Sequence, residues 1–148
     1  MTGWRPTVAA IIERQGRYLM VEETDGVHPE RVFNQPAGHV DPGETMLAAV
    51  VRETLEETGL AFTPEALLGI YHLKARNGRD YLRAAFIGSV PEGLEPAPQD
   101  SDILACHWLT REEIALRPRS SVVLTCIDDY LAGVRHPLSI VTHDQSDR

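Results

Sequence analysis

The sequence predicts a single domain of mixed α/β class, with helices packed on a mixed sheet, and two observations carry that prediction. Short apolar runs bounded by turn residues, which are typical of strands, recur along the chain, and one acidic segment in the first half has helical periodicity instead. The length of 148 residues corresponds to one domain, 1–148, and no internal repeat is visible.

The strands are expected in this order. Val8 to Ile12 and Tyr18 to Val21 are apolar runs separated by Gln15-Gly16, which predicts a hairpin. Val32 to Phe33 leads through Asn34-Gln35-Pro36 into the acidic segment. The later strands are expected at Leu67 to Leu73, Tyr81 to Val90 and Ile103 to Leu109, with a turn at Asn77-Gly78 and a loop over Pro91 to Asp102.

Two helices are expected after the last strand. Thr110 followed by Glu113 predicts a capping box at the start of a short helix. Ser120 or Ser121 is expected to cap the final helix, which should end near Gly133. Residues 143–148 are polar and are expected to form a loose tail.

The acidic segment is the most informative part of the chain. Glu53, Glu56 and Glu57 follow the i, i+3, i+4 spacing, which places their carboxylates on one face of a helix. The apolar residues Leu47, Val51 and Leu55 recur every four residues, and we expect the helix to pack through them.

Neighbouring carboxylates on a helix repel one another and lower its stability. A hard divalent cation offsets this repulsion, and Mg²⁺ prefers oxygen ligands. The alternative is a solvated acidic face with no ligand. The flanking residues favour a cation site, because Arg52 can hold Glu56 at i, i+4 and a Pro-Gly turn leads into the helix.

The pattern Gly38-x5-Glu44-x7-Arg52-Glu53-x2-Glu56-Glu57-x-Gly59 resembles the Nudix box of the Nudix hydrolases. One position departs from the family pattern, since Thr54 stands where the box usually has an aliphatic residue, and we expect the change to affect packing only. The resemblance implies the Nudix α/β/α sandwich with a mixed sheet.

The resemblance also implies roles for the residues of the box. Glu53, Glu56 and Glu57 would be Mg²⁺ ligands, with the Gly38 carbonyl as a further ligand, and Arg52 would orient the carboxylates. Glu44 is expected to tie the preceding loop to the helix, although a functional role is equally open. An oxygen-rich site also suits Mn²⁺.

Other motifs resemble one branch, the NudJ-type phosphatases. They are Val21-Glu22-Glu23-Thr24, Asn34 to His39, Asp100 to Ile103, and Tyr130 with Gly133, Arg135, Pro137 and Leu138. This resemblance implies release of orthophosphate from nucleoside tri- and diphosphates and from hydroxymethylpyrimidine diphosphate, a thiamine precursor. One alternative is a pyrophosphohydrolase that cuts an internal anhydride. Another is a nucleotide sensor without turnover, which the intact box carboxylates disfavour.

The general base is expected among the box glutamates or in the acidic loop, where Glu95, Asp100 and Asp102 stand. Asp102 is the first choice because it adjoins a strand, although a role as a loop or strand-capping aspartate has equal weight. Gln35 and Arg83 are the candidate substrate contacts.

The net charge of −8 argues against binding a nucleic acid polymer, which requires clustered Lys and Arg. A small phosphorylated metabolite is the expected partner, since its metal ions supply positive charge. Cys106 and Cys126 lack metal-binding or redox spacing. No secretory signal or membrane-spanning apolar run is present, so a cytoplasmic protein that binds no membrane is expected; the sequence does not predict an oligomeric state.

Overall fold

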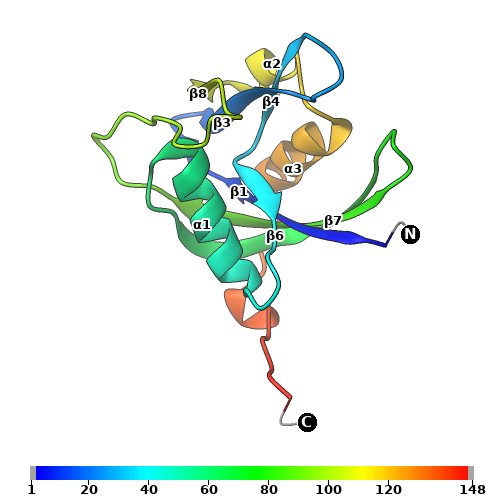
Figure 1. Ribbon diagram of the computed structural model, residues 1–148. Helices are drawn as coiled ribbons and strands as arrows, with labels where there is room; N and C mark the ends of the chain where they lie inside the picture. Colours follow the sequence, from blue (N-terminus) through cyan, green and yellow to red (C-terminus); the bar gives the residue numbers. More distant parts are fainter. Residues whose placement is uncertain (1–2, 147–148) are drawn as a thin grey trace.

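A computed structural model describes residues 3–146, and it has two four-stranded sheets with helices packed around one of them (Figure 1). The first sheet has the order β5-β1-β7-β6, and in the second β3 pairs with β2, β4 and β8. The strands are β1 (Arg5–Ile11), β2 (Glu13–Arg14), β3 (Arg17–Thr24), β4 (Arg31–Asn34), β5 (Ala37–His39), β6 (Thr63–Lys74), β7 (Asp80–Ser89) and β8 (Ala105–Leu109). The helices are α1 (Met46–Thr58), α2 (Arg111–Ile114), α3 (Ser121–Leu131) and the 3₁₀ turn η1 (Leu138–Ile140).

The predicted mixed α/β fold is confirmed. β1 runs parallel to β7, whereas the other strand pairs are antiparallel. Successive residues of a strand point to opposite faces of the sheet, so each central strand contributes to two cores. Val8 of β1 and Phe86 of β7 pack on the α1 side, and Ile11 and Ala85 pack on the α3 side. The result is the expected α/β/α sandwich.

The predicted hairpin near the amino terminus is partly wrong. Gln15 and Gly16 do form its turn, both with positive φ, but the turn joins the short β2 to β3. β1 pairs with β5 and β7 in the first sheet, whereas Tyr18 to Val21 pair with β4 and β8 in the second. The chain crosses from one sheet to the other near Ile12, whose carbonyl accepts from the N–H of Leu19 at 3.0 Å.

The other predicted strands are confirmed with shifted ends, β6 being longer than expected and β8 shorter. The loop from Pro91 to Asp102 is irregular, as predicted, and it is attached to the end of α1. The N–H of Ala97 donates to the Thr58 carbonyl at 2.8 Å, and those of Gln99 and Asp100 donate to the Glu56 carbonyl. These bonds hold the acidic loop beside the carboxylate helix.

The helix ends follow from local sequence. The Thr45 hydroxyl caps α1 by accepting from the N–H of Ala48, and Gly59 ends the helix with a left-handed φ of 74°. The predicted capping box of Thr110 and Glu113 is present. Ser120 occupies the N-cap position of α3, yet its side chain makes no capping hydrogen bond. The η1 turn was not predicted.

The predicted packing face of α1 is partly wrong, since Leu47 and Val51 pack against the core but Leu55 does not. The buried residues of the helix are Ala49, Val50, Thr54, Glu57 and Thr58. Leu55 is 43% exposed, and Leu47 and Val51, which are partly buried, line an open apolar hollow with Leu138. The buried face of α1 is rotated about the helix axis from the face that was expected. As a result, Glu57 points toward the protein interior and not into solvent.

Three further expectations concern the thiols, the tail and membranes. Both cysteines are free, Cys126 buried and Cys106 partly so. Residues 143–146 are exposed and lack regular structure, while 147–148, the rest of the predicted tail, lie outside the described residues. Across residues 3–146 no helix has the length and apolar character needed to cross a membrane.

Candidate active site

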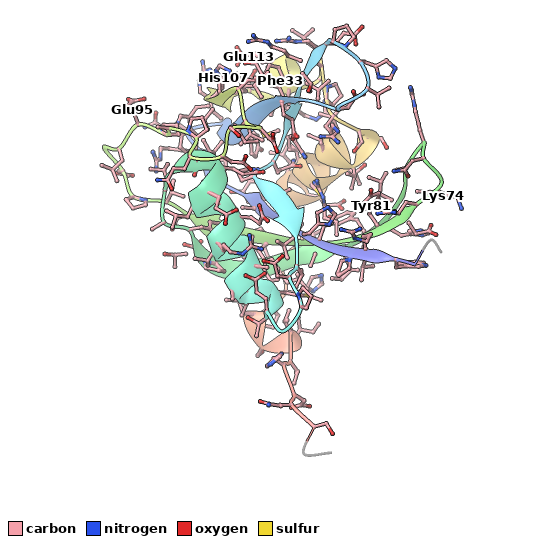
Figure 2. All side chains as sticks on the ribbon, viewed as in Figure 1. Phe33, Lys74, Tyr81, Glu95, His107 and Glu113 are labelled. Atoms are coloured by element: carbon pink, nitrogen blue, oxygen red, sulfur yellow. The ribbon has the colours of Figure 1, made fainter. Side chains whose placement is uncertain are left out.

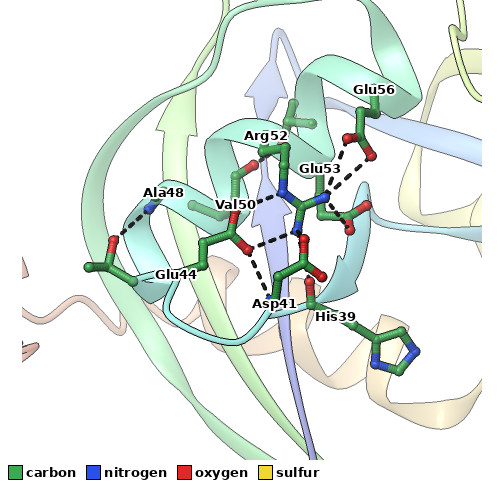
Figure 3. Close-up of polar contacts among 10 residues, drawn as sticks. His39, Asp41, Glu44, Ala48, Val50, Arg52, Glu53 and Glu56 are labelled. Carbon is green, nitrogen blue, oxygen red and sulfur yellow. Dashed lines mark hydrogen bonds and ion pairs between the residues drawn. The ribbon is translucent and has the colours of Figure 1, made fainter.

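Arg52 lies at the centre of a cluster of carboxylates (Figure 3). Three of them belong to Glu44, Glu53 and Glu56. Its Nε and Nη2 donate to the two oxygens of Glu44 at 2.7 and 2.9 Å, and its Nη1 donates to Glu53 at 3.0 Å. The same Nη1 lies 3.4 Å from the oxygens of Glu56. This fork therefore holds three side chains of the box in fixed positions.

Arg52 and Glu44 also join the helix to the segment before it. Nη2 of Arg52 donates to the His39 carbonyl at 3.0 Å, and Glu44 accepts from the N–H of Asp41 at 3.0 Å. The hydrogen bond from Arg52 and that from Asp41 lower the pKa of Glu44 to about 2. Glu44 is thus ionised at neutral pH and links the loop to the helix.

The Glu53 carboxylate lies directly against the backbone of Gly38 in β5. A Cβ at position 38 would overlap this carboxylate, so the close approach requires a residue without a side chain. Burial raises the pKa of Glu53, although the hydrogen bond from Arg52 opposes the shift. β5 and α1 therefore place the Gly38 backbone and a mostly buried carboxylate side by side.

Glu57 is the most buried carboxylate of the box, with 8% of the residue exposed. One of its oxygens accepts from the N–H of Ala37 in β5 at 2.9 Å. Burial raises the pKa of Glu57 to about 9, and the negative charges of Glu23, Glu53 and Asp100 act in the same direction. A cation bound next to this buried carboxyl would favour its ionised form, because it would offset both the burial and the neighbouring negative charges.

Thr54, the departure from the family pattern, is fully buried and satisfied. Its hydroxyl donates to the Val50 carbonyl at 2.7 Å, one turn back in α1. The substitution therefore concerns packing within the helix, and the charged positions around it are unaffected.

The residues present fit a hard divalent ion. The candidate donors are all oxygens, namely the carboxylates of Glu53, Glu56 and Glu57 and the Gly38 carbonyl, and Gly38 provides the space that Glu53 occupies. In residues 3–146 no three His, Cys, Asp or Glu side chains converge into a ready metal cage. Mg²⁺ characteristically uses few carboxylates and completes its shell with water and substrate phosphates.

The candidate bases of the acidic loop differ in position. Glu95 lies at the outer bend of the loop (Figure 2), and Asp102 is exposed. Asp100 is partly buried, and its negative charge acts on Glu57. The choice of Asp102 as the general base stays a prediction.

The candidate substrate residues Gln35 and Arg83 are buried and bonded within the protein. Arg83 donates to the side-chain oxygens of Gln35 at 2.8 Å and Asn34 at 3.1 Å. Nε2 of Gln35 donates to the Val123 carbonyl at 2.9 Å. Their role as substrate contacts stays a prediction.

The sequence analysis gave no role to Glu23 of β3, whose charge acts on Glu57. Glu23 is mostly buried, with 18% of its side chain exposed, and it pairs with Arg119 at 2.8 Å. No local pattern singled out Glu23, because consecutive glutamates in a strand point to opposite faces and both Glu22, 7% exposed, and Glu23 are largely buried.

Known proteins that are similar to this chain share its motif-bearing domain and its fold. Residues 3–125 match the NUDIX domain. Phosphatase NudJ of Escherichia coli (strain K12) is 36% identical over 137 residues, which cover 91% of this chain and 88% of that protein. A NUDIX hydrolase structure from Nitrosomonas europaea has a TM-score of 0.87 and 42% identity, covering 95% of this chain and 97% of its own. The NUDIX domain of Shewanella oneidensis NrtR, solved with ADP ribose, has a TM-score of 0.74 at 16% identity, covering 90% of each chain, and supports the fold alone.

Proposed function

We propose, from the premise that this chain belongs to the Nudix hydrolase family, that it releases orthophosphate from small phosphorylated metabolites with the help of Mg²⁺. The enzyme is a Nudix hydrolase and acts on phosphoanhydrides. The specific substrates proposed are nucleoside tri- and diphosphates and hydroxymethylpyrimidine diphosphate. The similarity to Phosphatase NudJ over most of both chains supports this choice.

One observation carries the proposal, namely the placement of Glu53 and Glu57 of α1 against the backbone of β5 at Gly38 and Ala37. Glu53, Glu56, Glu57 and the Gly38 carbonyl would hold the metal ion. When bound, a divalent ion neutralises phosphate oxygens and stabilises the charge that develops on the leaving phosphate. Mn²⁺ can take the same place.

The residues around these ligands have supporting roles. Arg52 keeps Glu53 and Glu56 separated and oriented, and Glu44 anchors Arg52 from the opposite side. Because both guanidinium edges are occupied by protein oxygens, we assign Arg52 a positioning role. We further propose that residues 1–148 form one such domain and that the protein works in the cytoplasm.

Product analysis tests the proposal. The protein is incubated with Mg²⁺ and, separately, a nucleoside triphosphate, a nucleoside diphosphate and hydroxymethylpyrimidine diphosphate, and orthophosphate and pyrophosphate are assayed independently. Orthophosphate from all three is the expected result. Pyrophosphate from the triphosphate would instead indicate attack at an inner phosphorus, as in a pyrophosphohydrolase, and no product from any of them would contradict the proposed substrates.

A further inference from the structure

A chain of hydrogen bonds connects the buried Arg83 to a carboxylate outside the box. Arg83, on β7, is 8% exposed, and within residues 3–146 no carboxylate forms an ion pair with it. Its Nη2 donates to Oδ1 of Asn34 at 3.1 Å. A guanidinium can only donate, so this contact fixes which end of the Asn34 amide faces it.

The orientation of the Asn34 amide allows it to donate a hydrogen bond to Glu23. With its oxygen bound to Arg83, Asn34 turns its NH₂ group toward Glu23, and Nδ2 donates to Oε1 at 3.2 Å. The other carboxylate oxygen of Glu23 accepts from Nη1 of Arg119 at 2.8 Å. Both oxygens thus have one charged or polar donor, and each keeps a lone pair for a water molecule.

Glu23 lies near enough to the box for its negative charge to act on Glu57. The segment that begins with Asn34 continues to Ala37, whose N–H binds the Glu57 carboxylate at 2.9 Å, so four consecutive residues connect the two acids. Arg119 pairs with Glu23, and the negative charge of Glu23 acts on both Arg83 and Glu57. Its neighbour Glu22 points to the other side of β3 and pairs with His107 at 2.8 Å.

We propose that Glu23 is the general base of this hydrolase and that Asn34, Arg83 and Arg119 are positioning residues that hold its carboxylate toward the attacking water. The inference rests on the proposed hydrolytic function. The Glu23 carboxylate takes a proton from water while the water oxygen forms a bond to phosphorus. The bond from phosphorus to the bridging oxygen breaks, the leaving phosphate keeps the electron pair, and protonated Glu23 returns its proton to solvent.

The test compares Glu23→Ala and Glu23→Gln with the wild type. Loss of a general base lowers kcat by about 10²–10⁴-fold. KM and the Mg²⁺ concentration for half-maximal rate should stay unchanged, and calorimetry should find unchanged binding of a nucleoside diphosphate. Added formate should restore part of the rate of Glu23→Ala, because it can occupy the space left by the carboxylate and accept the proton.

Two further variants separate positioning and structure from catalysis. Asn34→Ala should lower kcat by about tenfold, equivalent to one hydrogen bond to Glu23, without rescue by formate. Glu22→Gln is the matched control on the same strand and should leave kcat unchanged. Thermal unfolding of every variant checks that the fold is retained.

Three results would overturn the inference. They are a kcat for Glu23→Gln close to the wild-type value, a loss of rate that additional Mg²⁺ recovers, which would make Glu23 a metal ligand, and no formate rescue in a folded Glu23→Ala. Failure of the proposed function is distinct, because it would appear as absence of phosphate release by the wild-type protein.

Discussion

At the scale of single residues, the same side chain has different properties according to its surroundings. Glu44 and Glu57 belong to one sequence motif, yet hydrogen bonds lower the pKa of Glu44 to about 2 and burial raises that of Glu57 to about 9. Glu56, which is half exposed, shares Arg52 with two other acids. Burial and donors, rather than residue type, decide which carboxylates are ionised before a metal ion binds.

Glu57→Gln should lower phosphate release by about 100-fold or more, because it removes the charge of a metal ligand while keeping its shape. Without added metal the melting temperature should not fall, since burial raises the pKa of Glu57 to about 9 and a neutral amide oxygen can accept from the same Ala37 N–H. Phosphate assays and thermal unfolding measure the two effects, with the exposed Glu65→Gln as control. Retained turnover would remove Glu57 from the metal site.

Gly38→Ala should reduce both activity and stability, because the new methyl group overlaps the Glu53 carboxylate. Overpacking of this kind costs about 1–3 kcal/mol. Gly3→Ala is the control, since a Cβ there meets no atom within 4 Å. Urea unfolding and phosphate release are the measurements, and unchanged values for Gly38→Ala would mean that the contact with Glu53 is unimportant.

At the scale of elements, α1 has two functions on neighbouring faces. Val50 and Thr54 face the sheet, whereas Arg52 and Glu56 reach toward the loops. Glu57 lies between these faces, in the last turn of α1. Its carboxylate accepts a hydrogen bond from the N–H of Ala37 in the edge strand β5. The helix thus needs both its packing and its loop contacts to place the acids.

Val50→Ala should lower the free energy of unfolding by about 2 kcal/mol, whereas Leu55→Ala should cost less than about 1 kcal/mol. The reason is that Val50 is fully buried and Leu55 is 43% exposed. Urea unfolding of both variants determines which row of α1 faces the core. A larger loss for Leu55→Ala would favour the face expected from apolar periodicity.

Glu44→Gln should lower stability at neutral pH by about 1 kcal/mol, because Arg52 loses its ionised partner. The folded pKa of Glu44, about 2, lies below the unfolded value of about 4.3. The stabilisation is therefore fully present above the unfolded pKa and is lost as pH falls toward the folded pKa. Unfolding experiments from pH 7 to pH 2 should find a difference between wild type and variant that shrinks with acidity, and a constant difference would contradict this account.

At the scale of the whole molecule, the site forms where separate parts of the fold meet. The first sheet supplies β5 and β7, the second supplies β3 and β4, and α1 closes one side (Figure 1). Glu23 and Glu57 come from different elements, and the charge of Glu23 acts on Glu57 only because the parts of the fold that carry them are held together. Any loss of contact between the sheets should therefore reduce activity before it unfolds α1.

Mg²⁺ should raise the melting temperature of the wild-type protein, because a ligand that binds only the folded state stabilises it by about 2.7 kcal/mol at one hundred times its dissociation constant. Removal of the metal with a chelator should reverse the shift. Glu53→Gln and Glu57→Gln should respond much less, since each lacks one ligand charge. An equal response in all three proteins would place the metal elsewhere.

The sequence by itself determined the class of fold, most strands, the capping box of α2, and the motif that marks the family. Each of these depends on local rules, such as the alternation of a strand, the spacing of a helix or a capping side chain. The family motif likewise lies within one continuous segment, from Gly38 to Gly59.

Only the tertiary structure decided which face of α1 is buried, which sheet each half of the first hairpin joins, and that the charge of Glu23 acts on Glu57. Apolar spacing indicated Leu47, Val51 and Leu55 because periodicity identifies a stripe but not the partner that covers it. The environments of Arg83 and Glu23 depend on contacts between residues far apart in the chain. Burial and electrostatic coupling arise from such long-range contacts, so no local pattern contains them.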